Sequence, residues 1–285
     1  MKPLKLICLG LFIFLARESF PQHSPTSMQD KSIQITEARW NYTTSYHGKK
    51  ALLFIHGANS SSKIWKYQYE LELKGYKNIY VDLLGYGESE KPQSGYSLEK
   101  WIRGLKAILD KEELEEVHIV AHSNGVILAK EFYREFPEKV EGLILLDGML
   151  KAAIPKPMLS WMKSSLERSD YEEFMRANLE HMPTAGLREI DKNILKEDAL
   201  DTPLRIRKAE LELVGSEETW REIEILCPTS ILHSNNPMWT KEYMDDLQNI
   251  APGHTFILWE DAGHFLQLQY PSRLNELIRE IISLD

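Results

Sequence analysis

The stretch Val117–Leu128 constrains the fold of this chain most strongly; its sequence is Val-His-Ile-Val-Ala-His-Ser-Asn-Gly-Val-Ile-Leu. An apolar run ends at Ala121, a short polar turn follows, and apolar residues at helical spacing resume directly afterwards. The pattern predicts a strand, a tight turn and a helix, with Ser123 at the apex. A strained apex leaves little room for large side chains two positions away, and Ala121 and Gly125 are both small. Because Ser-Asn-Gly is also an ordinary turn sequence, the rest of the chain must decide whether Ser123 is a nucleophile.

The composition is that of a globular protein large enough for one α/β domain with an insertion. The 285 residues are 43% hydrophobic and 27% charged, with a formal net charge of -9. This acidic balance argues against nucleic acid or an anionic membrane surface as the main partner. The sequence has no Gly-rich phosphate loop and no Cys/His pair at metal-binding spacing, so we expect no cofactor and no metal.

The first twenty residues have the pattern of a secretory signal. Lys2 and Lys5 precede the apolar run Leu6–Ala16, and a polar stretch follows it. Eleven apolar residues are too few to span a bilayer comfortably, so a stable membrane anchor is not expected. We therefore expect residues 1–20 to be a signal peptide and the protein to be secreted or periplasmic. Its removal would leave Cys227 as the only cysteine, which excludes an intramolecular disulfide.

Apolar runs alternate with helical patterns along much of the remaining chain. The expected strands are Ala51–Ile55, Asn78–Leu83, Val117–Ala121, Gly142–Leu146, Thr229–His233 and His254–Trp259, with an edge strand over Ile33–Trp40. The expected helices are Leu98–Leu109, Val126–Phe136, Lys241–Ile250, Pro271–Ser283 and one that contains Trp65, Tyr69 and Leu73. This alternation predicts the α/β class, with a mostly parallel, doubly wound sheet.

The alternation of strand and helix patterns stops between Leu150 and Leu226, where the sequence contains no convincing strand pattern. Helical patterns occur instead over Met158–Ser169, Tyr171–His181, Ile190–Asp198 and Thr219–Ile225. An all-helical block after one strand suggests a cap over the carboxyl edge of the sheet, where ligands bind in open α/β folds. The expected divisions are the signal peptide 1–20, the core 21–149, the cap 150–226 and the rest of the core 227–285.

Four sequence blocks, in this order, resemble the α/β-hydrolase superfamily in its single-domain, capped form. The blocks are His56-Gly57, Asp82-Leu83-Leu84-Gly85-Tyr86-Gly87-Glu88-Ser89, Ala121–Gly125 and Asp261-Ala262-Gly263-His264-Phe265. The resemblance runs from about Ile33 to the C-terminus. It implies the α/β-hydrolase fold with an inserted all-helical cap.

The resemblance also implies roles for particular residues. Ser123 would be the nucleophile and His264 the general base. The amides of Ala58 and Asn124 would form the oxyanion hole, whereas His56 and His122 would be structural. An acyl pocket could be lined by Trp161, Met162, Phe174, Met175 and Trp220, although such residues at helical spacing are more often part of a cap core.

The acid of the triad departs from the family pattern. Most members of the superfamily have an aspartate after the strand that follows the cap, where this chain has Asn236. Some take the acid from the end of the preceding core strand, which corresponds to Asp147. We expect Asp147 to be the acid, with a carboxylate oxygen about 2.6–3.2 Å from His264 Nδ1, and keep Asn236 as an alternative orienting residue.

The expected activity is hydrolysis of a small or medium carboxylic ester through an acyl-enzyme on Ser123. The same serine would also serve a carbon–carbon bond hydrolase, an acyltransferase or a cofactor-free perhydrolase. A non-catalytic binding protein that retains the pocket is a further alternative, motivated by Asn236. Epoxide hydrolase and dehalogenase chemistry is disfavoured because those members of the superfamily use an aspartate nucleophile. The expected partner is a small-molecule ester, and no nucleic acid.

Overall fold

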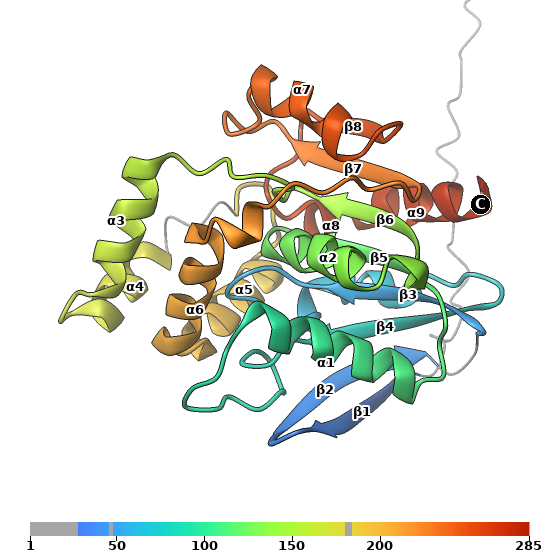
Figure 1. Cartoon of the computed structure of the whole chain (residues 1–285). Coiled ribbons are helices and arrows are strands. Elements are labelled where there is room, and N and C mark those ends of the chain that lie inside the picture. The colour runs from blue at the N-terminus through green and yellow to red at the C-terminus, as the bar shows by residue number, and fades with distance from the viewer. Residues whose placement is uncertain (1–27, 46–47, 180–183, 285) are drawn as a thin grey trace, which may run out of the picture.

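The computed structural model describes residues 28–45, 48–179 and 184–284 and shows one eight-stranded sheet with helices on both faces (Figure 1). The expected signal peptide lies outside the described residues. The strands are β1 (Met28–Ile35), β2 (Ala38–Ser45), β3 (Lys50–Ile55), β4 (Tyr76–Asp82), β5 (Val117–His122), β6 (Val140–Leu146), β7 (Thr229–Ser234) and β8 (Thr255–Trp259). Their spatial order is β1-β2-β4-β3-β5-β6-β7-β8, parallel from β4 to β8 and antiparallel at β1 and β2. The α/β fold class is therefore confirmed.

The helices of the core flank this sheet, and the remaining helices lie beyond its carboxyl edge (Figure 1). The core helices are α1 (Leu98–Lys111), α2 (Asn124–Glu135), α7 (Lys241–Ile250), α8 (Leu266–Gln269) and α9 (Pro271–Leu284). The helices between β6 and β7 are α3 (Lys156–Leu166), α4 (Tyr171–Asn178), α5 (Glu189–Asp201) and α6 (Leu204–Gly215). The described residues between β6 and β7 contain no strand.

The hydrophobic core has two halves because side chains alternate across the sheet. Leu53 and Ile55 of β3 pack in the half that contains α1, α2 and α7. Leu52 and Phe54 of the same strand pack in the other half, together with α9. A strand buried on both faces appears in the sequence as a continuous apolar run, which is why Ala51–Ile55 was recognisable.

Two predictions for the N-terminal part of the described chain were wrong. The expected strand Ile33–Trp40 is interrupted at Thr36, where φ is 53°, and the chain turns into the hairpin β1–β2. The helix expected around Trp65 and Tyr69 is replaced by two 3-10 turns, Ser62–Trp65 and Gln68–Glu70. Side chains of other elements satisfy carbonyls that an α-helix would use: the Tyr80 hydroxyl donates to Gln68 O and Asn78 Nδ2 donates to Leu71 O. Tertiary hydrogen bonds thus replace helical ones.

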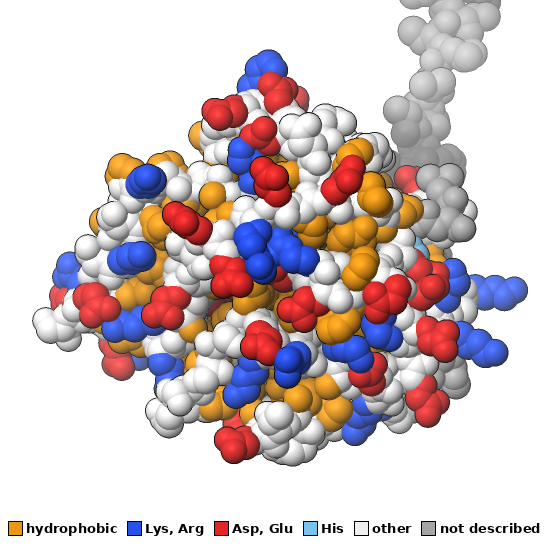
Figure 2. All heavy atoms as spheres, viewed as in Figure 1, with side chains coloured by type: hydrophobic (Ala, Val, Ile, Leu, Met, Phe, Trp, Pro, Cys, Tyr) orange, Lys and Arg blue, Asp and Glu red, His pale blue; other side chains and the backbone are white. Residues whose placement is uncertain are grey.

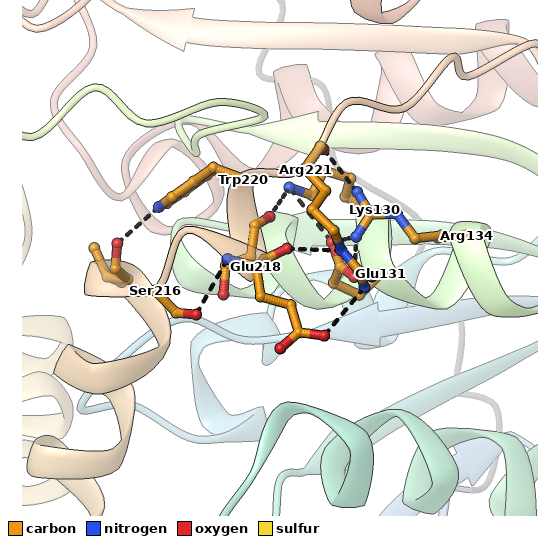
Figure 3. A network of polar contacts seen from close by, with 9 residues as sticks. Lys130, Glu131, Arg134, Ser216, Glu218, Trp220 and Arg221 are labelled. Carbon is orange, nitrogen blue, oxygen red and sulfur yellow. Dashed lines mark hydrogen bonds and ion pairs between the residues drawn. The ribbon is translucent and has the colours of Figure 1, made fainter.

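Two expectations for the inserted block also need correction. The sequence interpretation missed α6, and the helix expected over Thr219–Ile225 is only a 3-10 turn, Glu218–Trp220, followed by extended chain. Side chains of α2 bind the carbonyls of this segment, since Lys130 Nζ donates to Thr219 O and Arg134 Nη2 donates to Arg221 O at 2.9 Å. Figure 3 shows this network between α2 and the segment that leaves the helical block. It anchors the return to the core directly against the helix that follows Ser123.

The visible surface carries both signs of charge despite the net charge of -9. Figure 2 shows acidic and basic side chains interspersed over this face, with hydrophobic side chains between them. Among the helices of the described residues, none combines the length and the apolar character needed to cross a membrane.

Candidate active site

Ser123 lies at the turn between β5 and α2 in a strained conformation, with φ 55° and ψ -123°. A left-handed φ is unfavourable for a serine, and here backbone bonds maintain it: Ser123 N donates to Leu146 O and Val126 N donates to Ser123 O, both at 2.9 Å. The turn also requires glycine as a neighbour. A Cβ on Gly57 would lie 2.7 Å from the Ser123 Cβ, and one on Gly125 would lie 2.7 Å from the carbonyl oxygen of Ile55. The small residues around Ser123 are therefore a steric requirement.

His264 lies on the loop between β8 and α8, with its ring beside Ser123. The distance from His264 Nε2 to Ser123 Oγ is 3.0 Å. His122 supports this loop because its Nε2 donates to the His264 carbonyl oxygen at 2.8 Å. Burial lowers the pKa of His122 to about 3, so its ring is neutral and keeps the proton on the donating nitrogen.

Asp147 follows β6 and completes the constellation. Its Oδ2 lies 2.7 Å from His264 Nδ1, within the range expected from the sequence. Its Oδ1 accepts hydrogen bonds from Ser234 N at 2.8 Å, Ser234 Oγ at 2.9 Å and Trp239 Nε1 at 3.1 Å. Burial alone would raise the pKa of Asp147, but the hydrogen bond and charge of His264 and the Ser234 donors hold it below its usual value. The carboxylate is thus ionised and fixed in one orientation.

Asn236 does not contact His264 in this arrangement. Its Oδ1 accepts from the backbone amide of Met238 at 2.9 Å, and its carbonyl accepts from the amide of Trp239 at 3.0 Å. The side chain therefore closes a turn after β7, while Asp147 occupies the Nδ1 position of His264. The alternative role of Asn236 as the orienting residue has no geometric support.

The three side chains are arranged for general base catalysis. Because Asp147 accepts the Nδ1 proton of His264, the Nε2 lone pair faces the hydroxyl of Ser123. The base can then take the serine proton, and the carboxylate stabilises the imidazolium that forms.

The expected oxyanion residues lie beside a cavity. Asn124 is the first residue of α2, whose first-turn amides have no intrahelical acceptor. Ala58 follows His56-Gly57, and His56 fixes this loop by contacts of Nδ1 with Gly57 O and of Nε2 with the Leu83 amide. Ala58 and Asn124 both border a cavity of about 300 Å³ under the helical block.

The structure brings Trp161, Phe174 and the two methionines Met162 and Met175 to the same cavity. Trp220 is not among the residues that line it, and its Nε1 donates to Val214 O at 2.7 Å. The rings of Trp161 and Phe174 meet edge to face, with centroids 6.3 Å apart. Trp161 remains 58% exposed, which places it at the rim of the cavity. The surrounding wall is mostly apolar, with Met162, Leu166, Met175, Leu211 and Val214.

Three residues of the site were not recognised from the sequence. Ser234 and Trp239 lie on either side of Asn236 in the sequence. They act as hydrogen-bond donors to Asp147, a role that depends on how the fold brings Asp147 to them. Glu210 borders the cavity from α6, the helix that the sequence interpretation missed. A glutamate in an amphipathic helix carries no sequence signal that distinguishes a buried position from an exposed one. Among the described residues, no group of three or more His, Cys, Asp or Glu side chains is placed to hold a metal.

The model of the alpha/beta hydrolase family matches residues 52–277, which include Ser123, Asp147 and His264. The chain belongs to this family. It is 30% identical over 82% of its length to the AB hydrolase superfamily protein YisY of Bacillus subtilis, and the match covers 91% of that protein. A haloalkane dehalogenase of Mesorhizobium japonicum is 31% identical over 45% of this chain and 41% of the relative. An uncharacterized protein of Mycobacterium tuberculosis is 36% identical over 34% of this chain, and this match spans only 29% of that longer relative.

Solved structures share the fold of this alpha/beta hydrolase over nearly its full length. Epoxide hydrolase VrEH1 from Vigna radiata superposes with a TM-score of 0.78 at 19% identity, over 90% of this chain and 98% of the other. Est816, described as an N-acyl homoserine lactone degrading enzyme, superposes with a TM-score of 0.74 at 22% identity, over 88% and 99%. At these identities the similarity demonstrates the fold alone.

Proposed function

We propose that this alpha/beta hydrolase is a serine hydrolase that cleaves small to medium carboxylic esters through an acyl-enzyme. The observation that carries the proposal is the continuous hydrogen-bonded path from Ser123 Oγ through both ring nitrogens of His264 to Asp147. A buried, oriented carboxylate, an imidazole base and a hydroxyl on a strained turn are the components of nucleophilic acyl transfer.

The reaction proceeds in two halves. In the first, His264 Nε2 removes the Ser123 proton as Oγ attacks the ester carbonyl, and the amides of Ala58 and Asn124 bind the oxyanion. The tetrahedral intermediate collapses, the C–O bond to the alcohol breaks, and His264 returns the proton to the leaving oxygen. In the second half, His264 activates water, which releases the acid and regenerates Ser123.

The nucleophile type argues against epoxide or haloalkane hydrolysis here, although proteins of both names are among the similar ones. Attack of Ser123 on an alkyl carbon would form an ether. An ether has no carbonyl for water to attack, so the enzyme would be trapped after one turnover. An ester formed on a carboxylate nucleophile does not have this problem, whereas a serine ester is the intermediate that acyl transfer requires.

The cavity supports an acyl chain of moderate size as the bound group. Its volume of about 300 Å³ is at the lower end of small-molecule sites. Its wall is mostly apolar, and the residues of the expected oxyanion hole, Ala58 and Asn124, are part of it. The alternative of a non-catalytic binding protein was suggested by Asn236 at the usual position of the acid. The carboxylate of Asp147 beside His264 removes this reason for it.

The test combines labelling by a fluorophosphonate probe with turnover of p-nitrophenyl esters from acetate to decanoate. We expect the wild type to be labelled and to hydrolyse the shorter esters, and Ser123→Ala to lose both properties. Ser160→Ala is the matched control, because Ser160 is an exposed serine on α3, and it should be labelled like the wild type. Labelling of Ser123→Ala, or a wild type without labelling or turnover, would refute the proposal.

We also propose that residues 1–20 direct export, because Lys2 and Lys5 precede the apolar run Leu6–Ala16. N-terminal sequencing of the exported protein should give a start between residues 17 and 25. Recovery of the chain in the cytosol with Met1 intact would contradict this.

A further inference from the structure

The cavity beside the expected oxyanion hole contains one buried carboxyl group for which the mechanism has no use. Glu210 of α6 borders this mostly apolar space and is only 9% exposed. Asn124 Nδ2 makes a long contact of 3.5 Å with Glu210 Oε1. Asn124 directly follows Ser123 in the chain, and Asn124 and Glu210 border the same cavity.

The neighbouring charged and titratable groups leave Glu210 short of partners. Arg207, one turn earlier on α6, donates to the carbonyls of Ala199 and Thr202 and forms no ion pair with Glu210 in the described structure. The Tyr86 hydroxyl is buried beside Glu210 and is close enough to lower the pKa of that carboxyl as a donor, but it forms no hydrogen bond of good geometry within the described ranges. Burial raises the pKa of Glu210 to about 7, with Tyr86, Asn124 and Arg207 opposing that shift. Tyr171 also borders the cavity and is the other titratable group close to this carboxyl.

A buried polar group of this kind is costly unless it is hydrogen-bonded. A plain acyl chain in the cavity would remove water from Glu210 and leave it with only the long Asn124 contact and the nearby Tyr86 hydroxyl. A chain that carries a donor would complete the hydrogen bonding. Sites with a fixed polar group discriminate strongly against substrates that lack the complementary group.

We propose that Glu210 is a specificity-determining residue that accepts a hydrogen bond from a hydroxyl or amide N–H on the acyl part of the substrate. The preferred substrates are then esters of hydroxy or acylamino acids of short chain length, rather than plain fatty acyl esters. This inference rests on the proposed ester hydrolysis and identifies its substrate class.

The test compares p-nitrophenyl butyrate with its 2-hydroxy and 3-hydroxy derivatives, which differ from it by one donor. For the wild type, kcat/KM should be about tenfold higher for at least one hydroxy ester, which is the order expected for a hydrogen bond to a buried carboxyl group. Glu210→Leu should bring the ratio to about one, lowering the value for the hydroxy ester and raising it for butyrate. Glu210→Gln keeps an acceptor oxygen and should retain part of the preference.

The control is Tyr86→Phe, which removes the neighbouring hydroxyl and leaves Glu210 in place. If Glu210 served only to bind Tyr86, both substitutions would change the melting temperature alike and neither would change the substrate ratio, which would overturn the inference. Equal kcat/KM values of the wild type for butyrate and both hydroxy esters would overturn it as well, while ester hydrolysis itself stands. Absence of turnover for all three esters would instead refute the proposed function.

Discussion

Replacement of Asp147 by asparagine is the most informative perturbation of this site, because the structure predicts how the new side chain would orient. Three donors surround Oδ1, namely Ser234 N, Ser234 Oγ and Trp239 Nε1. An asparagine would place its side-chain oxygen at the Oδ1 position, because this oxygen can accept hydrogen bonds from the three donors. The NH₂ group cannot take that position, because it only donates. Its NH₂ group would therefore face His264 Nδ1.

That orientation would change the tautomer of the His264 ring. Nδ1 would have to accept a hydrogen bond, so the ring proton would move to Nε2, which lies 3.0 Å from Ser123 Oγ. The base would then present a donor to the serine. In serine proteases the corresponding change lowers kcat by about 10⁴, equivalent to about 5 kcal/mol in the barrier.

The assay is kcat/KM on the best p-nitrophenyl ester for Asp147→Asn, with thermal unfolding to confirm the fold. We expect a loss of about 10³–10⁴ in kcat/KM, and a decrease of about 2 kcal/mol or less in stability because every donor keeps an acceptor. Asn236→Ala is the control; its side chain binds only the Met238 amide in the described structure, so its kcat/KM should change by less than about threefold. Retention of a tenth of the activity by Asp147→Asn, or a larger effect at Asn236, would refute the reasoning.

Three further changes test the cavity and the buried titratable groups. Phe174→Ala widens the cavity and should shift the ester preference to longer chains, whereas unfolding without any such shift would make Phe174 a core residue. Burial lowers the pKa of His233 to about 4, so its neutral ring contributes stability that is present above pH 6.5 and lost as the pH falls to 4. His233→Phe should therefore reduce this acid loss by up to about 3 kcal/mol in melts from pH 8 to 4, and an unchanged slope would contradict the assignment. The pH dependence expected from Glu210 has the opposite sign. Because its pKa is raised to about 7, the stability of the folded protein falls as the pH rises from 4.5 to 7. Glu210→Gln should therefore be more stable than the wild type at pH 8 and about equally stable at pH 4.

The sequence determined those features that local chemistry imposes. The strands β3, β5 and β6 are buried on both faces, so their sequences are predominantly apolar. The turn at Ser123 leaves no room for a Cβ at Gly125, two positions along, and this small residue helped to make the expected nucleophile recognisable within five residues. The sequence also indicated Asp147 as the expected acid, because its position at the end of a core strand predicts the sheet edge from which its carboxylate emerges.

Tertiary structure decided what depends on side chains from distant elements. The segments around Gln68 and Thr219 have helical sequence patterns, but Tyr80 and Lys130 bind their carbonyls and keep them out of α-helices. Similarly, Asn236 and Asp147 were both candidates until the structure placed Asp147, and not Asn236, against His264. Hydrogen bonds between residues far apart in the sequence form only once the chain has folded, so no local pattern encodes them.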